Sequence, residues 1–405
     1  MEISTRGYNK KFLWINGALG TGKSALITQI VQNIRQNEIG VVDVFLCEAS
    51  TYETQSASTV IRFIADFLNR ISNSYLDEKL VNYICSPAFE SATDVDLFSR
   101  LIFEPTSRIT LEEKVFVIID ALDEMLPVEC NSFLDLLRKF DVPKWLNFIL
   151  TSRDESQILL SLSGVSEAIS LNDETENRND IAEYFRQELS LSEEDILALA
   201  TKCAGNFLYA FHICQYLQEY PDSTINDLPP SLFDMYDRML DRKYENNDEF
   251  EKDAKAVFEL LVAVKAPIAI SDIAKILGVS LSEINRRLKK ISAFLICYNA
   301  ESNSSKEYRI YNPSFVEYLT TSHDNIYCVN RHDGDNAICA YLKCNPKELL
   351  KSKYYNEYGL LHAIENKDVD LITSLISSEN EQLSEKIEND LYNVYLTNKT
   401  DVIDI

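Results

Sequence analysis

The 405-residue chain is 46% hydrophobic and 25% charged. This is the balance of a globular protein, and it excludes a wholly disordered or collagen-like chain. Lys and Arg number 39 against 64 Asp and Glu, so 39 − 64 gives a net charge of −25. Such a negative chain is not expected to bind nucleic acid or an anionic membrane in general.

Cysteine usage and the N-terminal stretch predict a cytoplasmic location. The nine cysteines never form a C-x-x-C pair, which is typical of free thiols in a reducing compartment. Residues 1–11 are polar and lack an apolar signal core. No run approaches the ~18 apolar residues of a membrane span, so neither secretion nor membrane insertion is expected.

Strands alternate with helices over about the first 170 residues. A short, wholly apolar run such as 115–119 is typical of a buried parallel strand. Apolar residues at helical spacing separate the runs that predict strands. The predicted strands are 12–15, 41–47, 115–119 and 146–150, and the predicted helices include 25–34, 58–71 and 131–140. This alternation predicts an α/β fold with a parallel sheet covered by helices on both faces, over residues 1–172.

The pattern becomes helical after residue 175. Helices are predicted at 179–189, 193–203 and 207–220, which gives an all-α helical domain over 173–250. Residues 251–322 then read as helices around a turn at Gly278, followed by two strand-like runs, the outline of a winged helix-turn-helix domain. The remaining residues, 323–405, are expected to form a helical linker.

The segment after the first predicted strand fits the pattern G-x-x-x-x-G-K-[ST]. Its glycines let the backbone curl around phosphates, Lys23 reaches the β- and γ-phosphates, and the Ser24 hydroxyl is a ligand for Mg²⁺. The alternative is a glycine-rich turn that binds nothing. The predicted phosphate-binding residues are Gly17, Ala18, Leu19, Gly20, Thr21, Gly22, Lys23 and Ser24.

Acidic side chains follow the apolar strand 115–119. Asp120 closes this strand at the sheet edge where the phosphate loop also lies, so we expect it to hold Mg²⁺ opposite Ser24, directly or through water. Asp123 and Glu124 stand where a group could position or polarise the attacking water. Alternatively, they form the acidic first turn of a helix.

Arg153 ends another predicted strand at the same edge. An arginine there could sense the γ-phosphate through bidentate contacts. The other interpretation is a surface arginine in a loop between strand and helix.

The predicted winged helix carries little net charge. Residues 251–320 hold ten Lys or Arg and eight Asp or Glu, a net of 10 − 8 = +2. Its basic side chains gather at 286, 287, 289 and 290, and adjacent positions point to different faces of a helix. DNA binding is therefore not expected.

These residues resemble the NACHT branch of the signal-transduction NTPases (STAND), relatives of the NOD-like receptors, over about residues 12–320. The segment 17–24 is similar to the Walker A motif of that family, and 148–153 to its sensor segment. The most specific likeness is Val115-Phe-Val-Ile-Ile-Asp-Ala-Leu-Asp-Glu124, which resembles its Walker B motif with an extra acidic pair. The helical pieces 180–184, 203–208 and 228–236 are similar as well.

The resemblance also implies a nucleotide contact from Asn312. Relatives that grip the nucleotide place a histidine in the segment where this chain has Tyr311-Asn312-Pro313-Ser314-Phe315. An asparagine can donate a hydrogen bond to the β-phosphate but carries no charge, so weaker locking by ADP is expected. Phe207 stands where some relatives place a proline against the base. Residues 358–372 resemble the start of an ankyrin-type repeat, of which about three are needed for a stable stack.

The resemblance implies a molecular switch that binds ATP or ADP with Mg²⁺, hydrolyses ATP slowly and rearranges its domains in signalling. Protein partners are expected through the helical or repeat regions, together with nucleotide-controlled homo-oligomers. One alternative is a degenerate scaffold that binds partners without nucleotide. A fast P-loop kinase is a further alternative, but the sequence has no motif for a phosphate acceptor.

Overall fold

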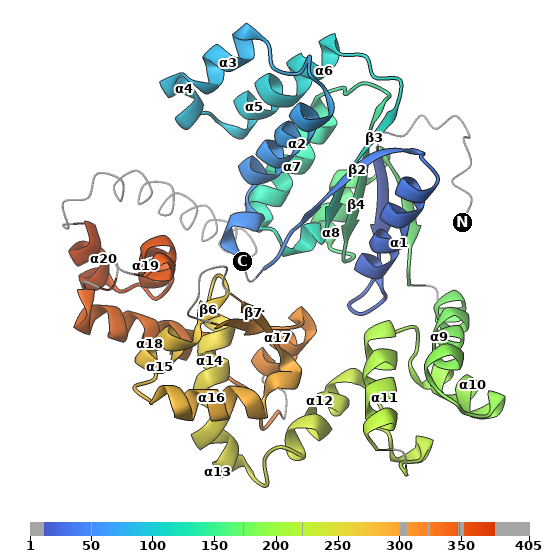
Figure 1. The fold of residues 1–405 in the computed structure, drawn as a ribbon, viewed down its shortest axis with the longest axis vertical. Helices are drawn as coiled ribbons and strands as arrows, with labels where there is room; N and C mark the ends of the chain where they lie inside the picture. The colour runs from blue at the N-terminus through green and yellow to red at the C-terminus, as the bar shows by residue number, and fades with distance from the viewer. Residues whose placement is uncertain are drawn as a thin grey trace. The chain divides into compact units, whose positions relative to one another are not determined.

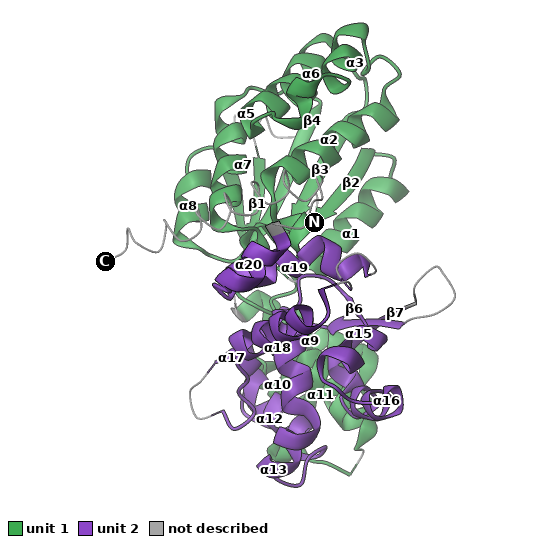
Figure 2. Cartoon of the chain, turned by 90° about the vertical axis from the view of Figure 1, so that its left-hand side faces the viewer, with its two compact units in different colours: residues 1–228 green, residues 229–405 purple. Residues whose placement is uncertain are grey.

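The computed structural model describes residues 12–376 apart from positions 50, 173, 221, 300–305, 322–324, 347 and 349–351. The chain divides into two compact units, residues 1–228 and 229–405, which Figure 2 colours separately. The predicted division into four domains stays a prediction.

A parallel five-stranded sheet in the order β2-β3-β4-β1-β5 forms the centre of the first unit. Every neighbouring pair in this sheet is parallel, so the carboxyl ends of all strands lie at one edge (Figure 1). The strands are β1 (Phe12–Asn16), β2 (Gly40–Leu46), β3 (Lys114–Asp120), β4 (Leu146–Ser152) and β5 (Ser166–Ser170).

Helix α1 (Lys23–Gln36) covers one face of this sheet. It buries Ile27 and Ile34 in a small cluster with strand residues that point to the same side. Because successive strand residues point to opposite faces, these residues alternate with those of the other face. The strand residues on the α1 side include Ile15, Val42, Ile118 and Ile149.

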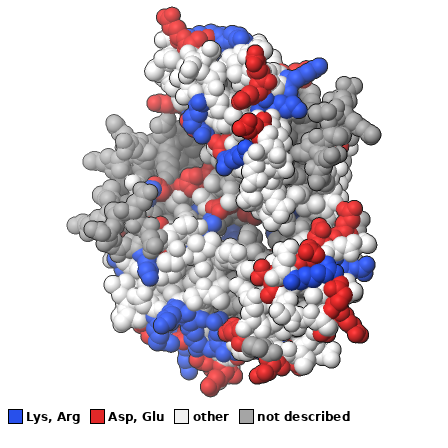
Figure 3. All heavy atoms as spheres, turned by 45° about the vertical axis from the view of Figure 1, so that its right-hand side comes forward, with Lys and Arg blue, Asp and Glu red and all other residues white. Residues whose placement is uncertain are grey.

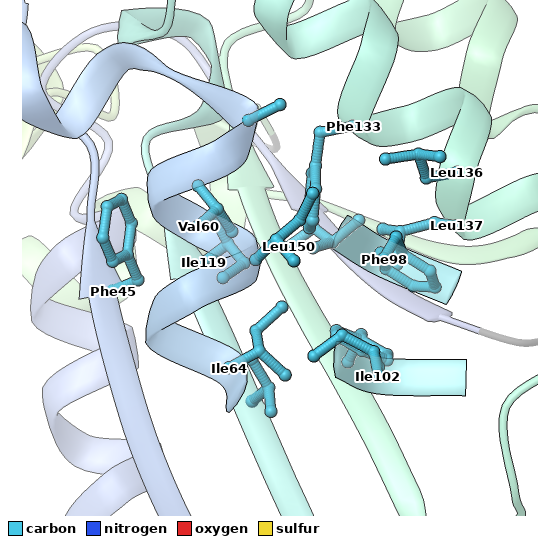
Figure 4. Packing of buried hydrophobic residues seen from close by; sticks show 14 of the residues in the cluster. Phe45, Val60, Ile64, Phe98, Ile102, Ile119, Phe133, Leu136, Leu137 and Leu150 are labelled. Atoms are coloured by element: carbon cyan, nitrogen blue, oxygen red, sulfur yellow. The ribbon is translucent and has the colours of Figure 1, made fainter. Parts of the chain in front are cut away.

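The larger core lies on the opposite face, against α2 (Ala57–Ile71), the π-helical segment η2 (Phe98–Phe103) and α7 (Pro127–Lys139). Figure 4 shows its packing, in which Ile119 and Leu150 of the sheet meet Ile64, Phe98 and Phe133 of the helices. Both faces of the sheet are therefore buried, and the α/β prediction with helices on both faces is confirmed.

Short helices fill the connections of the first unit. The sequence predicts one amphipathic segment over 97–111, and the structure has η2 followed by a separate helix in that stretch. The helices at 78–84, 87–90 and 156–162 have no predicted counterpart. The helices are α3 (Glu78–Ile84), α4 (Pro87–Glu90), α5 (Asp94–Leu97), α6 (Glu104–Arg108) and α8 (Ser156–Leu162), and the 3₁₀ turns are η1 (Tyr52–Gln55) and η3 (Leu122–Glu124).

Three helices follow β5 in the first unit, as predicted: α9 (Glu174–Glu188), α10 (Glu193–Lys202) and α11 (Phe207–Glu219). Polar side chains define two of their starts. Ser192 accepts a hydrogen bond from the Asp195 amide at the start of α10, and Asn206 accepts one from the Tyr209 amide at the start of α11. Such side-chain caps satisfy amides that have no partner within the helix.

His212 on α11 makes the stability of the first unit sensitive to acid. Its side chain is buried, and burial lowers its pKa to about 4 from 6.5. A proton therefore binds more strongly to the unfolded chain, so this contribution to stability is present above pH 6.5 and is lost between pH 6.5 and 4. We expect a loss of about 2 kcal/mol between pH 7.5 and 5.

This expectation is measured by urea unfolding at both pH values. His212→Leu should abolish most of the acid loss, whereas His332→Leu, at an exposed position of the second unit, should leave it unchanged. An acid loss that is equal in wild type and His212→Leu would show that another group is responsible.

The second unit combines helices with a three-stranded antiparallel sheet in the order β6-β8-β7. The strands are β6 (Ile268–Ala269), β7 (Leu295–Asn299) and β8 (Lys306–Ile310). The helices are α12 (Leu232–Asp241), α13 (Asn247–Phe250), α14 (Ala256–Ala263), α15 (Ile270–Ile276), α16 (Leu281–Lys290), α17 (Pro313–Thr320), α18 (Arg331–Cys344), α19 (Lys353–Glu365) and α20 (Val369–Ile376). Two short segments complete it, the π-helical η5 (Glu251–Lys255) and the 3₁₀ turn η6 (Ser292–Phe294), while the 3₁₀ turn η4 (Ile225–Asp227) lies at the end of the first unit.

Aromatic side chains form the core of the second unit. The rings of Phe294 and Phe315 stack with centroids 4.1 Å apart, and Tyr236 meets Phe315 edge-on at 5.0 Å. The Tyr236 hydroxyl is 2.7 Å from the Ser314 hydroxyl, so this buried polar group is satisfied. In the described part of the chain, no helix combines the length and apolarity needed to cross a membrane.

Candidate nucleotide-binding site

The predicted phosphate loop lies between β1 and α1, at the carboxyl edge of the sheet. Its strand ends at Asn16 and its helix starts at Lys23. The start of α1 has no side-chain cap and no acidic residue in its first turn. The first amides of α1 are therefore not satisfied by a side-chain cap, and a helix start of this kind attracts anions.

Lys23 reaches back across this loop. Its Nζ donates to the Gly17 carbonyl at 2.6 Å and to the Ala18 carbonyl at 3.0 Å. Burial lowers the pKa of Lys23, while Asp123 and Asp120 act in the opposite direction. The structure thus brings the lysine and these two carboxylates into one electrostatic neighbourhood.

Asp120 is the last residue of β3 and is only 4% exposed. Its Oδ1 accepts a hydrogen bond from the Thr151 hydroxyl of β4, and that hydroxyl accepts one from the Ala121 amide at 2.8 Å. Neighbouring strands therefore fix the orientation of the carboxylate. Ser24, the other predicted metal ligand, is exposed in the first turn of α1.

Asp123 is paired with Arg153. The Arg153 amide donates to Asp123 Oδ1 at 2.9 Å, and the Arg153 Nε lies 3.2 Å from Asp123 Oδ2. The Asp123 side chain is 6% exposed and that of Arg153 is 32% exposed. Both oxygens of Asp123 thus have a partner on Arg153. This arrangement suits a carboxylate that aligns the arginine better than one that activates water.

Glu124 points to another element. Its Oε2 accepts a hydrogen bond from the Ala49 amide, in the loop after β2, at 2.9 Å. Burial raises the pKa of Glu124 to about 7, and the nearby charges of Asp123 and Glu48 act in the same direction. A carboxyl group with a pKa near neutrality is suited to proton transfer. Of the two acidic candidates, the geometry favours Glu124 as the base. The two also lie in the first turn of the short 3₁₀ helix η3 (Leu122–Glu124), so the alternative of an acidic first turn is met in the structure too.

Asn172 and Asn206 at this edge have no predicted counterpart in the sequence, and Phe207 is expected against the base and not at the loop. Asn172, just after β5, accepts a hydrogen bond from the Ala18 amide at 2.8 Å. At the start of α11, Asn206 donates to the Leu19 carbonyl at 3.2 Å, and the Phe207 amide donates to the Gly20 carbonyl at 2.8 Å. The Cys203–Leu208 segment did signal a family likeness in the sequence, but not a contact with the loop.

Asn312 lies in the second unit, where it caps α17. Its Oδ1 accepts hydrogen bonds from the amide and the hydroxyl of Ser314, each at 2.9 Å. These contacts fix the orientation of the side chain, with its Nδ2 as the donor for other groups. The predicted bond from Asn312 to a phosphate stays a prediction.

The residues of the first unit fit a Mg-nucleotide. The loop has left-handed backbone at Gly20 and Gly22, with φ of 79° and 91°, and it leads into an uncapped helix start. Lys23 supplies a cation for phosphates, and Ser24 and Asp120 are oxygen ligands of the kind that Mg²⁺ prefers. Arg153 and Glu124 stand at the same edge of the sheet.

Comparison with known proteins agrees with this arrangement. The family model "Nephrocystin 3, N-terminal" matches residues 2–153. The vegetative incompatibility protein HET-E-1 of Podospora anserina is 22% identical over 303 residues, which cover 67% of this chain and 21% of that protein. The chain therefore spans about a fifth of the length of this relative.

Two of the similar solved structures are origin-recognition proteins. The Aeropyrum pernix Orc1 protein in complex with DNA is 14% identical with a TM-score of 0.35, covering 78% of this chain and 87% of that one. Cdc6p of Pyrobaculum aerophilum is 11% identical with a TM-score of 0.35, covering 76% and 86%. Neither likeness enters the assignment, which depends on the motifs, their places in the sheet and the sequence matches. In its motifs, their places in the sheet and these sequence matches, the chain is similar to P-loop NTPases of the NACHT type.

Proposed function

We propose that this protein is a molecular switch that binds ATP or ADP with Mg²⁺ and hydrolyses ATP slowly. The observation that carries the proposal is the position of Lys23. It lies in a Walker-type loop, and its charge interacts with Asp120, Asp123 and Arg153 at the carboxyl edge of a parallel sheet. This edge is where open α/β sheets bind their ligands.

Each residue of the edge has a distinct role in the proposal. Lys23 moves from the loop carbonyls to the β- and γ-phosphates, and Ser24 and Asp120 hold Mg²⁺, which neutralises charge on the phosphates when bound. Glu124, with its pKa about 7, takes a proton from the attacking water. Arg153, aligned by Asp123, senses the γ-phosphate.

The second unit supplies the moving part of the switch. Its order α14, β6, α15, α16, β7, β8 supports a winged helix-turn-helix, and Asn312 is proposed to meet the β-phosphate through Nδ2. The helix pair α19 and α20 supports the start of ankyrin-type repeats, as partner-binding elements. Nucleotide-controlled homo-oligomers and a cytoplasmic location belong to the same proposal.

The proposal is tested by the hydrodynamic radius and the protease pattern of the full chain with Mg-ADP and with Mg and a non-hydrolysable ATP analogue. A switch needs a ligand that binds its two states with different affinity. We expect the two nucleotides to give different radii and different cleavage sites. Identical results with and without either nucleotide would favour the nucleotide-free scaffold.

We further propose that α16 does not read DNA. Arg286 donates to Asp253 and to Glu283, with Nη1 2.9 Å from Asp253 Oδ2, and Arg287 donates to Glu283 at 2.9 Å. Lys290 pairs with Glu249 and lies 3.6 Å from Asp253. On the face of the molecule drawn in Figure 3, groups of blue Lys and Arg side chains have red Asp and Glu side chains beside them. Phosphates would have to displace these carboxylates.

We therefore expect no binding to a fluorescent duplex of about three helical turns at 150 mM salt. The measurement is fluorescence anisotropy against increasing protein at 50 and 150 mM salt. Micromolar binding that falls steeply with salt and is weakened by Arg286→Ala would contradict this part of the proposal.

A further inference from the structure

The first turn of α11 is bonded to the phosphate loop. The amides of Phe207 and Leu208 donate to the Gly20 carbonyl, at 2.8 and 3.2 Å. The first amides of a helix have no acceptor within the helix, so the loop supplies one for two of them. These bonds join residues far apart in the sequence but within the same compact unit.

Asn206 adds a third bond and links the two elements through one side chain. Its Oδ1 accepts from the Tyr209 amide at 2.9 Å, which caps α11, and its Nδ2 donates to the Leu19 carbonyl at 3.2 Å. One side chain therefore fixes the start of the helix and the outer turn of the loop together.

This contact also requires glycine at position 20. A Cβ on Gly20 would collide with the Asn206 amide, and the φ of 79° is one that other residues rarely adopt. The Phe207 ring lies 3.5 Å from the position that a Cβ on Gly22 would take. Glycine at position 20 is thus needed for the packing of α11 on the loop as well as for the approach of a ligand.

Holding two consecutive carbonyls orients the amides of the loop. In a planar trans peptide the C=O and the following N–H point in opposite directions. Because α11 binds the Leu19 and Gly20 carbonyls, the N–H groups of Gly20 and Thr21 are directed away from α11, and that of Thr21 donates to the Ala18 carbonyl at 3.4 Å. Amides of such loops are the groups that surround phosphates.

The turn before α11 is itself held in place. The Asn177 Nδ2 on α9 donates to the Leu171 carbonyl, just after β5, at 2.6 Å and to the Gly205 carbonyl at 3.3 Å. The position of α11 against the loop therefore depends on α9 as well as on the end of the sheet. A shift of these helices would be transmitted to the loop carbonyls.

We propose that Asn206 is a positioning residue that presets the amides of the phosphate loop and couples loop occupancy to the docking of α9–α11. The proposal rests on the proposed function, because it assumes that the loop binds phosphates. If occupancy favours one geometry of the loop, it favours one position of α11, and the coupling acts equally in both directions.

The test compares two variants of the full chain. Serine caps helices about as well as asparagine but is too short to carry a donor to Leu19, so Asn206→Ser keeps the cap and removes the link. Ser192→Ala is the matched control, since it removes a cap whose bond goes to Asp195 of its own helix. The readouts are the affinities for Mg-ADP and for inorganic pyrophosphate, and the hydrogen exchange of the loop amides without ligand.

We expect Asn206→Ser to weaken both ligands about tenfold and to speed exchange at Gly20 and Thr21, while Ser192→Ala stays within about twofold of wild type. A pyrophosphate effect would place the role at the phosphates and not at the base. If wild type binds both ligands and Asn206→Ser binds them with the same affinities, this inference is overturned and the proposed function is not. Wild-type protein that binds neither ligand would overturn the proposed function and this inference with it.

Discussion

Replacing Lys23 by alanine is expected to lower the affinity for Mg-ADP and Mg-ATP at least about 100-fold. The lysine is half-buried, donates to the loop carbonyls and interacts electrostatically with Asp120 and Asp123, and a hydrogen bond between charged groups is less screened there than in water. Such bonds contribute about 1.5–3 kcal/mol each, and about 2.7 kcal/mol corresponds to a factor of 100. Titration with a fluorescent nucleotide measures the change.

The matched control is Lys79→Ala, which removes an equally charged side chain at an exposed position paired with Glu104. We expect this variant to bind nucleotide as wild type does. Circular dichroism should show that both variants are folded. Equal affinities of wild type and Lys23→Ala would mean that the loop does not grip phosphates.

Replacing Glu124 by glutamine is expected to lower ATP hydrolysis about 100-fold or more, with nucleotide affinity changed less than about threefold. Glutamine keeps an oxygen that can accept the hydrogen bond from the Ala49 amide, so the loop after β2 should stay in place. The variant therefore removes the base with little change in the geometry. A coupled assay of phosphate release measures the rate.

The pH profile of wild type tests the same role from another side. With its pKa raised to about 7, Glu124 is mostly protonated at pH 6 and mostly ionised at pH 8. Because a general base acts in its ionised form, the rate should rise about tenfold per pH unit below 7 and level off above it.

Glu129→Gln is the matched control for Glu124. Glu129 also accepts a hydrogen bond from a backbone amide, that of Ala57 at 2.8 Å, and burial raises its pKa too. It lies in the first turn of α7 and serves the start of α2. A rate that falls equally in both variants would show that any buried carboxyl of this unit affects hydrolysis, and Glu124 would lose its role.

The local part of the site could be predicted from the sequence because strand, loop and helix follow one another in a short segment. The apolar run before Asp120 predicts β3, and the Walker-type spacing predicts the turn into α1. That helix starts at Lys23 and not at Ala25, because the glycines, and not the apolar pattern, define where it begins.

The rest of the site depends on contacts between distant residues, which single-sequence patterns do not show. Ala18 and Asn172 are 154 residues apart, and Leu19 and Asn206 are 187 apart. Strand β5 has a weak pattern, Ser-Glu-Ala-Ile-Ser, and forms because β1 offers it a parallel partner. Patterns in the sequence identify candidate residues, whereas the partners of Asp123, Glu124 and Gly20 come from the fold.

The charged run 242–253 is typical of a boundary or a solvated helix end, and in the structure its second half, from Asn247, is helical. Phe250 is buried, and η5 continues directly into α14. Its carboxylates are those that pair with the basic side chains of α16. Charges that are typical of a boundary or a solvated helix end thus hold two elements of one unit together.

The most direct test of the account is the adenine nucleotide content of the full chain. The protein is incubated with Mg-ATP, separated from free nucleotide and heated, and the released nucleotide is quantified by chromatography beside Lys23→Ala. We expect close to one ADP or ATP per wild-type chain and almost none in the variant. Wild type that releases no nucleotide, or as much as Lys23→Ala, would contradict the claim that this loop holds the ligand of a switch.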